Sequence, residues 1–256
     1  TGNTISGCTT GVLLTETYGE TVAQISHNTF EDNTVHVQDN RTTASTNYLV
    51  GLLENNTFPE GSRVIGNMIM VPEFKDGKAY NITTGVEYDN IQGAIDPENA
   101  GHTILVGSGT YEENLVIDKL LVLNGAGRDV TTIKGNISIR TSNVTIEGFT
   151  IEGEVVGPSV ELLSDIFEKN EFAQESIIVQ LQDGTAKITS PSNAKVVNTA
   201  RNRGYEDFKT AVDAAEPGDT IKLMSDIQLE TRIDIAGKTL TLDLNNHKLS
   251  TVDVVG

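Results

Sequence analysis

The sequence predicts an all-β protein built from right-handed parallel β-helix (solenoid) modules, each with a short N-terminal capping helix. Three observations indicate this fold class. Short apolar motifs recur at a nearly constant interval, apolar and polar residues alternate within them, and a longer pattern recurs after 117 residues. The short interval, about 23 to 28 residues, is too long for a heptad and corresponds to one coil of a solenoid, whose inner face is buried only when coils stack.

The short repeat is clearest in the triplet Asn-Thr-apolar, which begins at Asn3, Asn28 and Asn56. Alternate side chains of a strand face the same side, so the apolar members should face the interior, and asparagines at the turns can stack as hydrogen-bonded ladders. Leucine-rich repeats have a similar period, but their Leu-x-x-Leu-x-Leu signature is missing from the sequence. From the 23-residue spacing we expect these side chains to face the interior: Val12, Leu14, Val35, Val37, Val116, Leu121, Leu123, Ile139, Val144 and Ile146.

The longer repeat relates nine residues between Tyr88 and Val106 to nine between Tyr205 and Leu223, always 117 residues apart. Each copy begins with an amphipathic stretch, and in the second copy Pro217-Gly218 ends it. We expect short helices near 90–95 and 206–215 that cover the open end of a module. Their buried apolar faces should be formed by Ile91, Ala94, Ile95, Phe208, Ala211 and Val212.

These repeats predict three modules. Residues 1–80 form the later coils of one β-helix, residues 81–200 a second module, and residues 201–256 the opening of a third. The polar, turn-rich segment 183–204 is expected to be a connection.

The composition excludes several classes of protein. The chain has 36 acidic and 18 basic residues, a formal net charge of −18, which disfavours nucleic acid as a partner. No apolar run reaches membrane-spanning length. Aromatic residues make up 5% and Trp is absent, unlike most enzymes with a deep pocket. The single cysteine, Cys8, cannot form an internal disulfide, and we expect it to be a small buried residue.

Two segments carry a family resemblance. The segment from Tyr88, YDNIQGAIDPENAGHTILVGSGTYEENLVIDKLLVLNGAGRDVTTIKG, resembles the opening of β-helix proteins in the pectate-lyase superfamily, which includes pectin methylesterases. The segment from Tyr205, YEDFKTAVDAAEPGDTIKLMSDIQLETRIDIAGKTLTLDLNNHKL, resembles the repeat opening of large bacterial and archaeal surface proteins. The resemblance implies the fold and an extracellular, cell-surface location. It says little about chemistry, because the matched positions are core and turn residues.

Enzymes of that superfamily place several Asp on neighbouring coils, or pair Asp with Gln donors and an Arg-Pro-Trp segment. This chain has no Trp and no Arg-Pro step. The segment Asp165-Ile166-Phe167-Glu168 resembles an esterase motif, but it lacks a companion Gln-Asp motif and is interpreted as a chance match. We therefore expect no catalytic residues, no enzyme activity and no cofactor.

Two kinds of binding site remain open at this stage. The four histidines have no metal-ligand spacing, whereas Glu112 and Glu113 could contribute to a Ca²⁺ site with Asp118. Acids at turns are more often simply solvated. Five Asn-x-Ser/Thr sequences are candidate glycan attachment points in a glycosylating secretory pathway: Asn40, Asn55, Asn81, Asn136 and Asn143.

The functional expectation is a structural or adhesive extracellular surface protein. The alternative is a carbohydrate-active or carbohydrate-binding β-helix protein, such as a polysaccharide lyase, hydrolase or esterase. If the sequence is a complete subunit, its start inside a repeat and its end soon after the third module opens predict that copies stack head to tail in a filament, sheath or surface layer; the alternative is a fragment of a longer chain. Surface glycans are a second expected partner.

Overall fold

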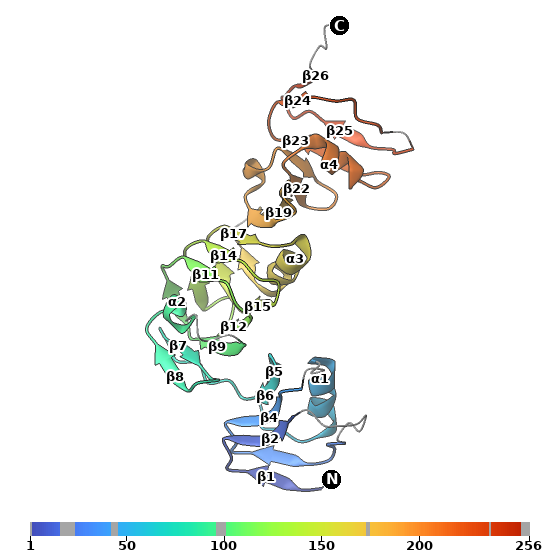
Figure 1. Cartoon of the computed structure of the whole chain (residues 1–256). Helices are drawn as coiled ribbons and strands as arrows, with labels where there is room; N and C mark the ends of the chain where they lie inside the picture. Colours follow the sequence, from blue (N-terminus) through green and yellow to red (C-terminus); the bar gives the residue numbers. More distant parts are fainter. Residues whose placement is uncertain are drawn as a thin grey trace.

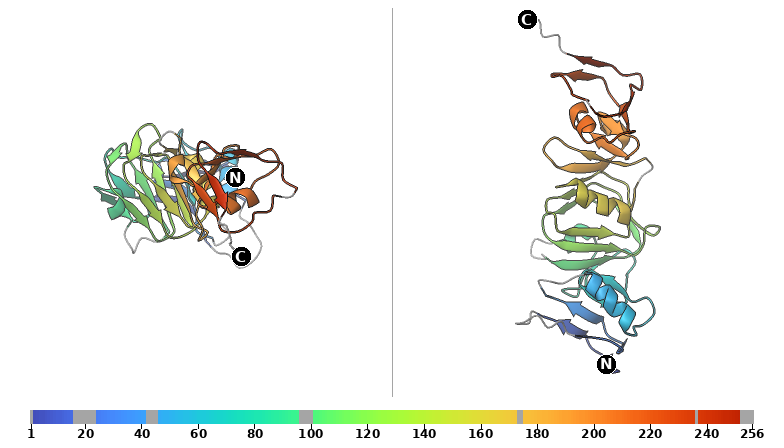
Figure 2. Two further views of the ribbon diagram at one scale, coloured as in Figure 1. Left: turned by 90° about the horizontal axis from the view of Figure 1, so that it is seen from above. Right: turned by 90° about the vertical axis from the view of Figure 1, so that its right-hand side faces the viewer.

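The computed structural model describes residues 2–15, 24–41, 46–95, 101–172, 175–235 and 237–251. These residues form many short strands, with four short α-helices and one 3-10 turn (Pro191–Asn193) among them. The elements follow one another in an elongated row, with β1 (Thr4–Ser6) at one end and β26 (Leu249–Thr251) at the other (Figures 1 and 2). The predicted all-β class is confirmed.

Three stacks of parallel strands, each within its own sheet, form the central part of the chain. The chain passes through the three sheets in order and then starts again, so each strand pairs in parallel with its equivalent one passage later. We call one such passage a coil. The first sheet holds β9 (His102–Val106), β12 (Leu121–Gly125) and β15 (Val144–Glu147); the second holds β10 (Gly109–Tyr111), β13 (Thr131–Ile133), β16 (Thr150–Ile151) and β18 (Glu171–Phe172); the third begins with β11 (Leu115–Ile117), β14 (Ile137–Ile139) and β17 (Val155–Gly157).

The register of the first sheet agrees with the 23-residue spacing, because Leu121 pairs with Val144 and Leu123 with Ile146. The prediction is wrong for Val116, which pairs with Ser138 and is 37% exposed. In the third sheet, which holds β11 and β14, the spacing between paired residues is one residue shorter. Ile117 rather than Val116 therefore lies beside Ile139. Side chains alternate along a strand, and a slip of one residue therefore reverses the face.

The N-terminal part repeats the pattern with two coils. β1 pairs in parallel with β3 (Thr29–Glu31), and β2 (Thr10–Leu14) with β4 (Val35–Asp39). Val12 pairs with Val37 rather than with Val35, and this shift of two positions keeps all three side chains on the inner face. Leu14, Val35 and Val37 are buried, and Val12 is partly buried, as predicted. The helix α1 (Thr46–Asn55), which the repeat pattern did not predict, follows.

Asparagine ladders link the coils at their turns. Asn3 Nδ2 donates to Asn28 Oδ1, and Asn28 Nδ2 donates to Asn56 Oδ1, each over 3.2 Å. In the central part the backbone N–H of Asn136 donates to Asn114 Oδ1 over 2.8 Å. The predicted ladders are confirmed, and they satisfy backbone groups that a strand ladder cannot reach at a turn.

Antiparallel hairpins occur where one set of coils gives way to the next. The hairpin β5 (Arg63–Ile65)/β6 (Met68–Met70) pairs with β4, and β7 (Ala79–Asn81)/β8 (Val86–Tyr88) pairs with β9. Two further hairpins follow β17, namely β19 (Ile177–Gln180)/β20 (Ala186–Thr189) and β21 (Val196–Asn198)/β22 (Arg203–Tyr205). The prediction of a connection over 183–204 is therefore wrong, since this segment contributes strands with buried residues such as Ile188 and Val196.

These hairpins extend the third sheet into the C-terminal part. β17 pairs with β20, β19 with β22, and β21 with β23 (Thr220–Leu223), which pairs in parallel with β25 (Thr241–Asp243). The sheet has nine strands among the described residues. A separate pair, β24 (Ile227–Leu229) and β26, belongs to the same coils as β23 and β25. Backbone pairing is thus continuous from the central to the C-terminal part.

Short helices lie beside the strands at the predicted places. α2 (Ile91–Ala94) and α4 (Phe208–Asp213) begin at Asn90 and Asp207, whose side chains accept a backbone N–H as N-caps. All six predicted apolar residues of these helices and their ends are buried. The longer helix α3 (Val160–Lys169) was not predicted. It begins at the N-cap Ser159 and buries Leu163 and Ile166.

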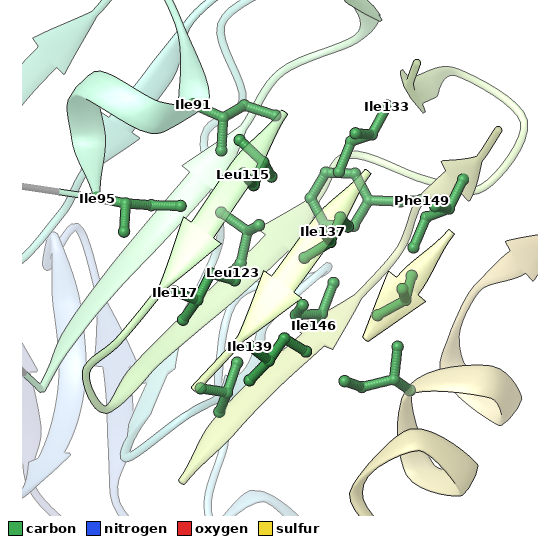
Figure 3. Packing of buried hydrophobic residues seen from close by; sticks show 14 of the residues in the cluster. Ile91, Ile95, Leu115, Ile117, Leu123, Ile133, Ile137, Ile139, Ile146 and Phe149 are labelled. Atoms are coloured by element: carbon green, nitrogen blue, oxygen red, sulfur yellow. The ribbon is translucent and has the colours of Figure 1, made fainter. Parts of the chain in front are cut away.

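The largest hydrophobic cluster lies inside the central coils and draws on residues 79–188. Figure 3 shows Ile91 and Ile95 at one end of the row of side chains that continues through Leu115, Ile137 and Ile146. Separate clusters lie in the N-terminal part (residues 14–69) and the C-terminal part (residues 196–227). The module limits at 1–80, 81–200 and 201–256 stay a prediction.

Candidate functional surfaces

The acidic residues proposed for a Ca²⁺ site have other partners. Glu113 accepts the backbone N–H groups of Ile91 and Gln92 over 2.8 and 2.9 Å, so it caps helix α2. Asp118 pairs with Lys119 over 3.0 Å, and that hydrogen bond lowers the pKa of the Asp118 carboxyl. Across the described ranges no group of three or more His, Cys, Asp or Glu side chains has an arrangement that could hold a metal ion.

The segment 165–168, which resembles an esterase motif, lies in helix α3. Ile166 is buried in the central core, and Asp165 pairs with Lys169 one turn later over 3.0 Å. These contacts give the segment a structural role in the helix.

The histidines are separate, and one of them is unusual. His36 is buried edge-on against the stacked rings of Phe30 and Phe58, and neither ring nitrogen has a partner among the described residues. Burial lowers the pKa of His36 because the charged imidazolium loses its hydration. Cys8 is exposed, so the prediction of a buried cysteine is wrong. It lies at the turn between β1 and β2, where its backbone N–H donates to Asn33 Oδ1 over 3.0 Å.

The five candidate glycan attachment points are not equivalent. Asn81 is 0% exposed, and its Oδ1 accepts the backbone N–H groups of Thr83 and Thr84. Asn40, Asn55, Asn136 and Asn143 are exposed. A glycan on Asn81 would have no space in this fold, whereas the other four side chains reach solvent.

The buried Asn81 belongs to a polar contact that occurs twice. Its Nδ2 lies 3.1 Å from His102 Nδ1, and 117 residues later Asn198 Nδ2 donates to Asp219 Oδ2 over 2.7 Å. The backbone N–H of Glu216, the amide of Asn198 and the guanidinium of Arg201 together lower the pKa of Asp219 to about 2. These contacts join β7 to β9 and β21 to β23, where hairpins meet new coils.

A groove of about 730 Å³ separates the N-terminal and central parts. One wall comes from the end of β4 and the β5–β6 turn, and the other from the outward faces of β9, β12 and β15. The candidate residues Asn40 and Asn143 both line it, together with Asp39, Arg41, Thr103 and Thr145. Sequence reasoning missed this groove, since its residues come from segments far apart in the chain that no motif connects.

The C-terminal part has an apolar cavity of about 500 Å³ beside β24, β25 and β26. Its lining includes Phe208, Val212, Leu229, Leu240, Leu242 and Leu249. Leu242 corresponds to Leu123 of the central part. Leu242 pairs with Ile221 and Leu123 pairs with Ile104, and these two partners are equivalent positions of the 117-residue repeat. Leu123 is 0% exposed beneath the next coil, whereas Leu242 is 43% exposed.

Comparison with known proteins adds one finding. No protein-family model matches the chain, and no solved structure matches it. A cell surface glycoprotein of Methanothermus fervidus is 34% identical over 104 residues, which cover 38% of this chain. Part of this chain is therefore similar to a cell surface glycoprotein. The match covers 18% of the length of that relative, and it supports a location at the cell surface.

The described helices include none that is both long and apolar enough to cross a membrane.

Proposed function

We propose that the chain is a structural segment of an extracellular surface protein, built from right-handed parallel β-helix modules, with no catalytic activity. The main support is the parallel pairing of successive coils together with the asparagine ladders at their turns. Stacked coils give a stiff, extended body whose outer surface is polar. The formal charge of −18 keeps such bodies from associating side by side. The similarity to a cell surface glycoprotein supports the location.

The proposal includes head-to-tail contact between copies. At one end of the row, β25 and β26 are edge strands in the described part of the chain, and Leu242 and Leu244 are exposed beside them. At the other end β1 and β2 are edge strands, and Leu13 is 52% exposed. In the described part of the chain, the outer edges of β1, β2, β25 and β26 have no strand partner, and such edges favour addition of another strand. A second copy that stacks its first coil on β25 and β26 would cover Leu242 as the third central coil covers Leu123.

Paired variants on β25 test this contact. Leu242→Asp places a charge at the apolar end, and Thr241→Asp places the same charge on the adjacent outward position. We expect sedimentation of the wild type and of Thr241→Asp to show concentration-dependent assembly, and Leu242→Asp to remain monomeric. A wild type that stays monomeric at all concentrations, or equal assembly by both variants, contradicts the head-to-tail proposal.

The second candidate function is a carbohydrate-active or carbohydrate-binding protein. The observation in its favour is the polar groove, whose walls carry hydroxyl, amide and charged groups suited to sugar hydroxyls. Incubation with pectins, alginate and host glycans separates the two candidates. Release of reducing ends, unsaturated products or methanol that a single Asp substitution abolishes would favour an enzyme, and its absence favours the structural proposal.

A further inference from the structure

The groove between the N-terminal and central parts has polar groups on both walls. On the N-terminal wall Arg41 forms two hydrogen bonds of 2.7 Å with the carboxylate of Asp39, and the hydrogen bond from Arg41 lowers the pKa of that carboxyl. Beside this pair, Asn67 Nδ2 donates to Asn40 Oδ1 over 3.0 Å. The wall is therefore held in place by its own hydrogen bonds before any ligand is present.

The central wall is an outward row on three neighbouring strands. Thr103, Val122 and Thr145 pair side by side across β9, β12 and β15. Thr103 is 2% exposed, so the accessible groups of this row are the Thr145 hydroxyl and the aliphatic side chain of Val122. A hydroxyl beside an aliphatic surface suits a sugar ring, which carries hydroxyl groups at its edge and C–H groups on its faces. The groove volume of about 730 Å³ lies within the range of small-molecule sites and would hold a few sugar rings.

The two parts touch directly at one corner of this groove. A cluster of Ile65, Met70 and Leu105 joins the β5/β6 hairpin to the outside of β9. Gly66, with φ +57°, lies so close to Val122 and Thr103 that a Cβ atom there would be 3.1 Å from Val122 Cγ2. No strand pair connects the two parts among the described residues, unlike the continuous sheet between the central and C-terminal parts.

Asn143 stands at the mouth of this groove, at the turn that leads into β15. It is exposed, and its sequence Asn143-Val144-Thr145 places the required hydroxyl on the groove wall itself. Two other candidate asparagines are less suited to carry a glycan. Asn55 Nδ2 already donates a hydrogen bond to Gly51 O over 2.7 Å, and Asn81 is buried and leaves no space for a sugar. Asn136 is exposed but is not among the residues that line the groove.

We propose that Asn143 carries an N-linked glycan whose first sugars lie in this groove and hold the N-terminal and central parts together. The inference rests on the proposed function as a structural segment of an extracellular surface protein. In the attachment step the Asn143 Nδ2 displaces phosphate from the anomeric carbon of a lipid-linked oligosaccharide phosphate, in a reaction supplied by a membrane oligosaccharyltransferase. The new bond is C–N, the C–O bond to phosphate breaks with its electron pair, and the amide nitrogen loses one proton.

The experiment uses the full chain, produced in a host that glycosylates Asn-x-Ser/Thr sequences. Glycopeptide mass spectrometry measures the occupancy of each sequence, and amide hydrogen exchange measures protection of the β5–β6 turn. We expect Asn143 to be occupied and Asn81 to be empty. We also expect exchange at Gly66 and Asn67 to slow several-fold relative to the same protein after enzymatic removal of glycans.

Variants separate the glycan in the groove from glycans elsewhere. Asn143→Gln should lose the slow exchange, and Asn55→Gln, at an acceptor sequence whose asparagine does not line the groove, should retain it. Asn136→Gln, at an exposed sequence away from the groove, should retain it as well. An unmodified Asn143 in protein that carries glycans at Asn55 or Asn136 would overturn this inference alone, as would an occupied Asn143 without slower exchange. Absence of glycans from every sequence would also overturn this inference, whereas the structural proposal fails separately, in the assembly test of the β25 variants.

Discussion

Val116 and Ile117 are neighbours on β11, yet their side chains have opposite environments. Ile117 is fully buried in the central core, whereas Val116 is 37% exposed. The 23-residue spacing selected Val116 because it treated all coils as equal in length. The coil that joins β11 to β14 is one residue shorter, and its length is set by turns whose residues show no fixed period. Apolar character alone cannot distinguish adjacent β-branched residues, so the exact register could not be obtained from the sequence.

Aspartate substitutions at these two positions test the register at the residue scale. Ile117→Asp would bury an unpaired carboxylate and should lower the free energy of unfolding by several kcal/mol. Val116→Asp places the same charge in solvent and should cost about 0.5 kcal/mol or less. Urea titration of both variants gives the comparison, and similar midpoints would mean that the two side chains do not differ in burial.

His36 predicts a pH dependence of stability in the N-terminal part. Burial lowers the pKa of His36 in the folded chain below its ordinary value of 6.5, so the unfolded chain binds a proton more readily. The contribution of neutral His36 to the free energy of unfolding is therefore present above pH 6.5. It is lost as the pH falls from 6.5 to the lowered pKa of His36 in the folded chain. Each unit of depression corresponds to about 1.4 kcal/mol.

Hydrogen exchange of β3 and β4 between about pH 7.5 and pH 5, corrected for intrinsic rates, measures this dependence. His36→Leu keeps an apolar side chain against Phe30 and Phe58 and should remove most of the pH dependence, whereas His247→Leu at a partly exposed position should leave it intact. Equal pH dependence in the wild type and His36→Leu would refute the role of His36.

At the scale of the elements, the short helices were predictable and the hairpins were not. α2 and α4 show apolar spacing, N-caps and a clear repeat at 117 residues, and these signals are local. The strands β20, β21 and β22 have three or four residues each, separated by polar turns, so they offer too few alternations to recognise. They form strands in the folded chain because β17 provides a backbone partner for β20 and the sheet buries their apolar side chains. Neither interaction can be seen in the local sequence.

The cap of α2 predicts a distinct role for Glu113. Glu113→Ala removes the acceptor for two backbone N–H groups and should lower the free energy of unfolding by about 1 kcal/mol. Glu112→Ala, at the exposed neighbouring position, should have little effect. Thermal unfolding with and without Ca²⁺ completes the test: a rise in the melting temperature of the wild type that Glu113→Ala abolishes would indicate a cation site instead of a cap.

At the scale of the whole molecule, the 117-residue repeat marks two equivalent places where new coils begin. Both have a hairpin, a buried asparagine and a short helix, and the asparagine contacts His102 in one copy and Asp219 in the other. The order of these units followed from the repeat. The groove did not, because Asn143 comes near Asn40 and Asn67 only when the two parts pack together. Surfaces formed by distant segments leave no periodic signal in a single sequence.

The proposed β-helix depends most directly on the parallel register of the stacked coils. Engineered disulfides on the outer face measure this register. In a Cys8→Ser background, Val116→Cys with Ser138→Cys joins residues that pair across β11 and β14. Val116→Cys with Arg140→Cys is the matched control, two residues further along the same direction and beyond disulfide reach. The stacked-coil account predicts rapid oxidation of the first pair without loss of stability and none of the second. Preferential oxidation of the second pair, or of neither, would contradict it.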